Sequence, residues 1–119
     1  MKNIKFYTDE NGNSDLYNYL KVLELKNDKD SILNAKKIYS YIENLSKYGI
    51  KMGEPLVKYL GNKIWELMPL RHRILFFEDS DCFVLLSHFV KETKKTPRDE
   101  INKARKRMID YLERNDKYE

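Results

Sequence analysis

The chain has 119 residues, the size of one ordinary domain, and we expect a single domain over residues 1–119. Apolar residues make up 41%, enough for one core, and charged residues make up 35%, above the roughly 25% of average soluble chains. With four Gly, three Pro and 13% aromatic residues, the composition excludes fibrous, low-complexity and generally disordered chains. One cysteine, Cys82, excludes an internal disulfide and a cysteine-based metal framework.

No apolar run approaches the roughly 20 residues of a membrane-spanning helix, and we find no signal peptide, so we expect a cytoplasmic protein without a membrane partner. The net charge is +4, and the positive charge is concentrated near the C-terminus. Residues 91–107 carry eight Lys or Arg against three Asp or Glu. Clustered cations can neutralise the phosphates of a polyanion, although a solvated basic helix face explains the charge equally well.

The first part of the chain predicts a short strand followed by a helical hairpin. Residues 4–8 have strand composition. Apolar residues then recur at helical spacing, first at Leu16, Leu20 and Leu23 and later at Ala35, Ile38, Ile42 and Leu45. The N-cap candidates are Asn13 or Ser14 for the first helix and Asp30 or Ser31 for the second. Gly49 stands where a left-handed cap would end the second helix.

The rest of the chain predicts four strands and a last helix. The strands are residues 57–60, 64–68, 73–78 and 83–90, which are rich in β-branched and aromatic residues. Gly61-Asn62 is typical of a hairpin turn between the first two. In the last segment Thr96 is the N-cap candidate and Pro97 fits the first helical position. The buried stripe of this helix is Ile101, Ala104, Met108 and Leu112.

This order predicts an α+β fold. Its antiparallel sheet is mixed at the N-terminal strand, and it carries an N-terminal α-hairpin and a C-terminal helix. We expect the helices on one side of the sheet, with the other face solvated or binding a ligand.

The sequence excludes several kinds of site. Two His and one Cys without metal-ligand spacing make a zinc or iron site a poor interpretation, and we expect no metal and no cofactor. No nucleophile-elbow motif and no glycine-rich phosphate loop is present. What remains is a cluster of cations on the sheet.

Antiparallel pairing predicts where these cations meet. Arg71 and Arg73 stand at the start of one strand, and Lys91 stands at the end of its neighbour. Lys94 and Lys95 follow in the next loop, and Lys58 lies on an earlier strand. Unbroken alternation places Leu85, Ser87, Phe89 and Lys91 on one face, and Val84, Leu86, His88 and Val90 on the other.

Structural alternatives exist for several of these residues. Arg73 could instead form an ion pair with Glu66. We expect His72 at the surface of a strand end, and His88 partly buried among apolar neighbours.

Four segments together resemble the phage-derived branch of the HigB/RelE toxin superfamily: KYLGNKIWELMP (58–69), RILFF (73–77), VLLSHFVK (84–91) and KTP (95–97). The resemblance covers about residues 55–112, and the predicted element order also fits. It implies a RelE-like fold and the toxin of a type II toxin–antitoxin pair. Such toxins are metal-independent endoribonucleases that usually cut mRNA on the ribosome. It also implies a helix-turn-helix, HigA-like antitoxin and binding of operator DNA by the complex.

The chemistry of this cleavage assigns roles to the cations. The 2′-OH attacks the phosphorus, so the protein must bind the extra negative charge and move two protons. We expect Arg73 to bind that charge with help from Arg71. Lys91 or Lys95 is then the general base or acid, and His88 is a candidate only if it points to the open face. The residues expected to hold flanking RNA are Lys58, Lys94 and Arg98.

Three positions depart from the family pattern: Met68 replaces a usual Arg, His88 a frequent Gly, and Glu92 a frequent Lys. Arg71 is a hypothetical spatial substitute for the missing Arg. The alternative function is a catalytically weak toxin homologue that acts as an antitoxin-binding corepressor. A general RNA-binding protein is the third interpretation.

Overall fold

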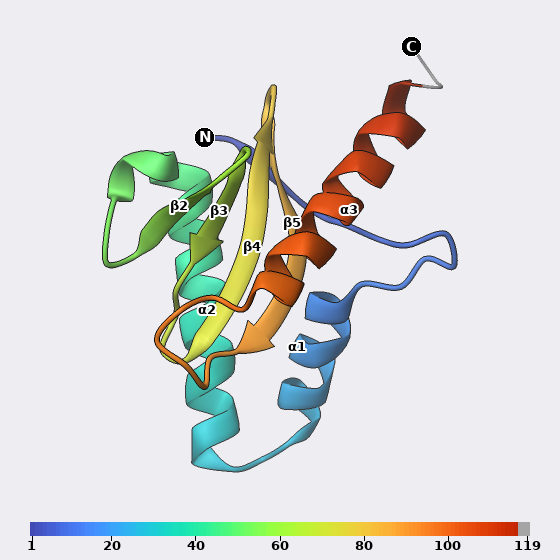
Figure 1. Cartoon of the computed structure of the whole chain (residues 1–119). Helices are drawn as coiled ribbons and strands as arrows, with labels where there is room; N and C mark the ends of the chain where they lie inside the picture. The colour runs from blue at the N-terminus through green and yellow to red at the C-terminus, as the bar shows by residue number, and fades with distance from the viewer. Residues whose placement is uncertain (117–119) are drawn as a thin grey trace.

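The computed structural model describes residues 1–116 (Figure 1). Its elements are β1 (Asn3–Phe6), α1 (Asp15–Leu25), α2 (Lys29–Tyr48), the 3-10 helix η1 (Gly49–Met52), β2 (Val57–Gly61), β3 (Ile64–Leu67), β4 (His72–Asp79), β5 (Cys82–Val90) and α3 (Arg98–Asp116). The predicted order of elements is confirmed, with boundaries shifted by up to three residues. Among the described residues, no helix combines the length and the apolar character that crossing a membrane requires.

The five strands form one sheet in the order β1-β5-β4-β3-β2. Strands β2 to β5 pair antiparallel as a meander, and β1 pairs parallel with β5. The predicted α+β fold with a mixed N-terminal strand is therefore confirmed, and it is consistent with a RelE-like fold.

Helices cover both faces of the sheet, which corrects the prediction that all lie on one side. In Figure 1, α2 runs behind the sheet and α3 crosses in front of it. One core lies between the α-hairpin and the sheet and includes Leu20, Ile38 and Phe76. The second core lies under α3, where Ala104 and Met108 pack with β4 and β5. The signal for this arrangement was in the sequence, because continuous apolar runs such as 74–77 are typical of strands buried on both faces.

A bulge in β5 changes which side chains face which layer. The pairing with β4 passes from Leu75 with Ser87 to Phe76 with Leu85. The unpaired residue is Leu86, and one extra residue moves all later side chains to the opposite face. The predicted alternation is therefore wrong beyond this point. Phe89 lies in the core under α3 with Val84, whereas His88 points toward the α-hairpin.

The ends of the two N-terminal helices are fixed by polar side chains. Ser14 caps α1 by accepting a hydrogen bond from the backbone N–H of Tyr17 at 3.2 Å, which confirms one of the two candidates. The predicted cap of α2 is wrong, because the N-cap is Asp28 and the helix begins at Lys29. The Asp28 carboxylate accepts from the backbone N–H of Ser31 at 2.8 Å and from its hydroxyl at 3.0 Å. Gly49 ends α2 at the predicted position with a positive φ of 66°, but its ψ of −159° lies outside the left-handed helical region.

The first hairpin turns one residue later than predicted. Gly61 still belongs to β2 and pairs with Ile64, so the two turn residues are Asn62 and Lys63. Both have positive φ, at 51° and 72°. A turn with two successive residues of positive φ matches the right-handed twist of the flanking strands, and it therefore commonly connects the two strands of a hairpin.

Candidate functional site

Most of the predicted cations line one hollow of about 690 Å³ at the end of the sheet where β4 begins and β5 ends. Its charged lining residues are Lys58, Arg73, Lys91, Lys94, Lys95, Glu54 and Glu66. We call this hollow the cationic cup. Pairing of Arg73 with Phe89 brings the start of β4 next to Lys91, as antiparallel geometry predicted. Five cations face two carboxylates, so the cup is suited to an anionic ligand.

Arg73 is held rigidly at the wall of the cup. Its Nη1 donates hydrogen bonds to the carbonyl of Leu70 at 2.9 Å and to that of His72 at 2.7 Å. These bonds support a turn in which Leu70 has φ of 57°, a conformation that is unfavourable for Leu. The Nε of Arg73 is buried and has no hydrogen-bond partner among residues 1–116. The alternative ion pair between Arg73 and Glu66 is not formed within that part of the chain.

Two threonines shape the loop of residues 91–97 that carries Lys94 and Lys95. The Thr93 hydroxyl donates to the carbonyl of Lys95 at 2.7 Å. The Thr96 hydroxyl donates to Oε2 of Glu66, whose side chain is almost fully buried beneath the loop. This contact fastens the loop to β3. Sequence reasoning missed the role of this pair, because nothing in the spacing of residues 30 apart indicates their contact.

The contact also corrects the predicted start of the last helix. Thr96 does not cap α3, since its hydroxyl bonds Glu66. Instead the Pro97 carbonyl accepts from the backbone N–H groups of Glu100 and Ile101, at 3.1 and 3.2 Å. Arg98 is the first helical residue.

The remaining predicted cations lie beside the cup. Arg71 lines an adjoining hollow of about 430 Å³ with Glu92, and this hollow shares Arg73, Lys91 and Lys94 with the cup. Nη2 of Arg71 donates a hydrogen bond to the carbonyl of Lys91 at 3.2 Å. Arg98 lines a further groove that shares Lys95, Thr96 and Ile101 with the cup. Met68 lines the cup itself.

The two histidines lie on the other side of the sheet from the cup. His88 is partly buried, as predicted, whereas the prediction for His72 is wrong. His72 is 3% exposed, not a surface residue. Its Nε2 lies 2.7 Å from Oδ1 of Asn34, and its Nδ1 lies 3.1 Å from Nε2 of His88. Tyr19 stacks on His88 with 4.3 Å between ring centroids. The bulge has thus turned His88 toward the α-hairpin and away from the cup, so the condition for its acid–base role is not met.

Burial controls the charge of this histidine pair. Burial is the main cause that lowers the pKa of His88 to about 4, and the neighbouring His72 contributes to the lowering. Burial and then the charge of Arg73 lower the pKa of His72. Because Asn34 Oδ1 can only accept, His72 donates from Nε2 and accepts at Nδ1 from His88. Neutral rings therefore link α2 to the start of β4.

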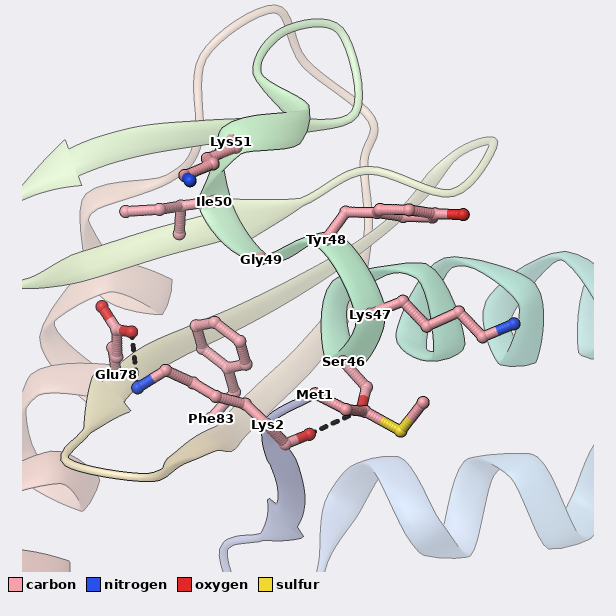
Figure 2. A pocket seen from close by; sticks show the side chains of 10 residues that line it. All are labelled: Met1, Lys2, Ser46, Lys47, Tyr48, Gly49, Ile50, Lys51, Glu78 and Phe83. Carbon is pink, nitrogen blue, oxygen red and sulfur yellow. Dashed lines mark hydrogen bonds and ion pairs between the residues drawn. The ribbon is translucent and has the colours of Figure 1, made fainter.

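A second hollow, of about 380 Å³, lies at the opposite end of the sheet (Figure 2). Figure 2 shows the Lys2 amine directed at the Glu78 carboxylate, with 2.7 Å between the charged atoms. The Ser46 hydroxyl donates to the Lys2 carbonyl, which ties β1 to the end of α2. Lys2 is thus neutralised by Glu78, whereas the lysines of the cup form no ion pair within residues 1–116. No group of three or more His, Cys, Asp or Glu suited to a metal ion occurs within the described residues.

The match to known families is consistent with this arrangement. The model of the family described as Phage derived protein Gp49-like (DUF891) matches residues 19–109, which include β2 to β5 and the whole cup. No curated protein matches the chain. The chain belongs to this Gp49-like family of phage-derived proteins, which is of the RelE kind and generally toxin-like in toxin–antitoxin systems, with an antitoxin as partner.

Proposed function

We propose that this protein is a HigB-type toxin that cleaves mRNA on the ribosome as a metal-independent endoribonuclease. The observation that carries the proposal is the cationic cup, in which five cations, Arg73 among them, face two carboxylates. A guanidinium is suited to a phosphate, because it stays charged and can bind two oxygens at once.

In this reaction the protein must remove a proton from the 2′-OH, stabilise the negative charge on the phosphoryl group, and protonate the leaving oxygen. The 2′-OH of the RNA loses its proton and attacks the neighbouring phosphorus, and the 5′-oxygen leaves with a proton, giving a cyclic phosphate. Arg73 binds the negative charge that develops on the phosphoryl oxygens. Lys91 and Lys95 flank it and move the protons. Lys58 and Lys94 bind the phosphates on either side. Arg71 supports this group from the adjoining hollow.

The partners follow from the same proposal. A helix-turn-helix antitoxin of the HigA kind neutralises the toxin, and the complex binds operator DNA through the antitoxin. The substrate is mRNA in the ribosome, whose phosphates meet the cations of the cup.

Replacement of Arg73 tests the nuclease directly. Losing a transition-state charge stabiliser costs on the order of 10²–10³ in rate, so Arg73→Ala should no longer arrest growth or produce new mRNA 5′ ends. Arg73→Lys keeps the positive charge but loses the bidentate hydrogen bonding to two phosphate oxygens, so it should retain part of the activity. Binding of the antitoxin by both variants is the control for folding. Full growth arrest by Arg73→Ala would contradict the assignment.

One observation favours a second candidate, a catalytically weak homologue that serves as an antitoxin-binding corepressor. Met68 lines the cup where the family usually carries Arg, and Glu92 adds a negative charge beside Arg71 and Lys91. Mapping of mRNA 5′ ends after induction separates the two candidates. New 5′ ends support the nuclease, and repression of the operator without new ends supports the corepressor.

A further inference from the structure

A groove of about 670 Å³ runs from the cationic cup along the first turns of α3. We call it the flanking groove. One wall is the β2–β3 turn with Asn62, and the other is α3 with Arg98, Asn102 and Arg105. Its floor is the loop that carries Lys95. Because Lys95, Thr96 and Ile101 line both hollows, the cup and the groove adjoin, and a chain bound in the cup can continue into the groove.

The groove has strong and uncompensated positive charge. Three of its lining residues are cations, Lys95, Arg98 and Arg105, and none is acidic. All three are exposed, and none forms an ion pair within residues 1–116. A concave surface lined by charge of one sign attracts a polyanion.

The adjoining side of α3 is different. There Lys103 pairs with Glu100 at 3.1 Å, and Arg107 pairs with Asp15 at 2.7 Å. Arg107 also donates to the carbonyl of Leu86, so it serves the packing of α3 on the sheet. Two cations on this side, Lys103 and Arg107, are thus paired within the fold, whereas Lys106 and the cations of the flanking groove form no ion pair within residues 1–116.

The residues of the groove also indicate which part of a nucleic acid it binds. No lining residue is aromatic, so the groove has no platform on which bases can stack. Arginine guanidinium groups and the amides of Asn62 and Asn102 are donors to phosphate oxygens. The groove is therefore suited to a single-stranded backbone, with little preference for base sequence.

We propose that the flanking groove is a second RNA-binding site, which holds the strand that extends beyond the scissile phosphate. Arg98 and Arg105 each bind one backbone phosphate, and Asn62 and Asn102 donate to the same stretch of backbone. This proposal rests on the proposed nuclease function, because that function puts RNA in the cup.

The test is the salt dependence of RNA binding. The probe is a fluorescent 2′-O-methyl RNA of about 12 nucleotides, which cannot be cleaved because its 2′-oxygens are blocked. Each phosphate neutralised on a single strand contributes about 0.7 to the slope of log affinity against log salt. The double variant R98A/R105A should lower the slope by about 1.4 and weaken binding about 25-fold at 0.1 M salt. The matched control K36A/K37A removes two exposed lysines from α2 and should keep the slope of the wild type.

The outcomes are distinct. Equal slopes for R98A/R105A and the wild type would overturn the proposal, as would equal losses in both double variants. Unchanged RNA binding combined with lost binding of an oligoglutamate peptide would assign the groove to an acidic protein segment and also overturn it. Cleavage by the wild-type protein is measured separately, as new 5′ ends in a translated mRNA. If the wild type does not cleave mRNA but R98A/R105A has a reduced slope, the nuclease function is refuted and the RNA-binding groove is retained. If the wild type cleaves mRNA but R98A/R105A has an unchanged slope, the groove is refuted and the nuclease function is retained.

Discussion

Acidification between pH 7 and pH 5 should destabilise this protein through one pair of side chains. The chain has two histidines, and both belong to the buried pair His72–His88. The groups nearest the pair are Asn34, Tyr19, Arg73 and Asp15. Burial outweighs the opposing charge of Asp15, and it lowers the pKa of both rings. Carboxylates with lowered pKa values, such as that of Asp28, stay charged in this range.

The magnitude follows from the lowered pKa of His88. Its pKa falls from an ordinary value of 6.5 to about 4, so the unfolded chain binds more protons than the folded one in this range. Stability therefore falls as the pH falls through 6.5, and the loss is complete below pH 4. At pH 5 the free energy of unfolding should be about 1–2 kcal/mol lower than at pH 7.5, after allowance for the partial exposure of the ring. Protonation of His72 adds to this loss.

Urea unfolding at pH 7.5 and pH 5 measures the effect. The variant His88→Gln removes the titrating ring and should lose less stability between the two pH values than the wild type. A conservative control, Lys37→Gln on the exposed side of α2, should behave as the wild type does. Equal pH dependence in the wild type and in His88→Gln would refute the argument, because it would show that other groups carry the protons.

Four further predictions concern the site and the core. Thr96→Val leaves the buried Glu66 carboxylate without its hydroxyl partner, so the free energy of unfolding in urea should fall by about 1–3 kcal/mol and mRNA cleavage should decrease. Thr96→Ser keeps the hydroxyl and should retain both stability and cleavage. Asp28→Ala removes the cap of α2 and should cost about 1 kcal/mol, with mRNA cleavage unchanged. Glu92→Lys adds a cation beside the cup and should strengthen binding of 2′-O-methyl RNA about fivefold at 0.1 M salt; weaker binding would contradict the role given to local charge. Ile38→Ala opens a cavity at a fully buried position and should cost about 2–5 kcal/mol in urea unfolding.

Much of the architecture could be predicted because its signals are local. The helical stripe from Ala35 to Leu45 follows from a period of 3.6 residues, and the strands follow from short β-branched and aromatic runs. The antiparallel order of strands β2 to β5 then implied that the start of β4 lies beside the end of β5. That is why the sequence alone predicts Arg73 and Lys91 in one cluster.

Only the tertiary structure decided which way several side chains point. One unpaired residue, Leu86, turned His88 from the expected face into a buried pair with His72. The contact between Glu66 and Thr96 joins residues 30 apart that no periodicity connects. Strand register and loop closure depend on how distant segments pack, and a shift of one residue reverses a face. The sequence by itself thus determined the elements and the position of the positive charge, while packing determined which cations share the cup and which line the groove beside it.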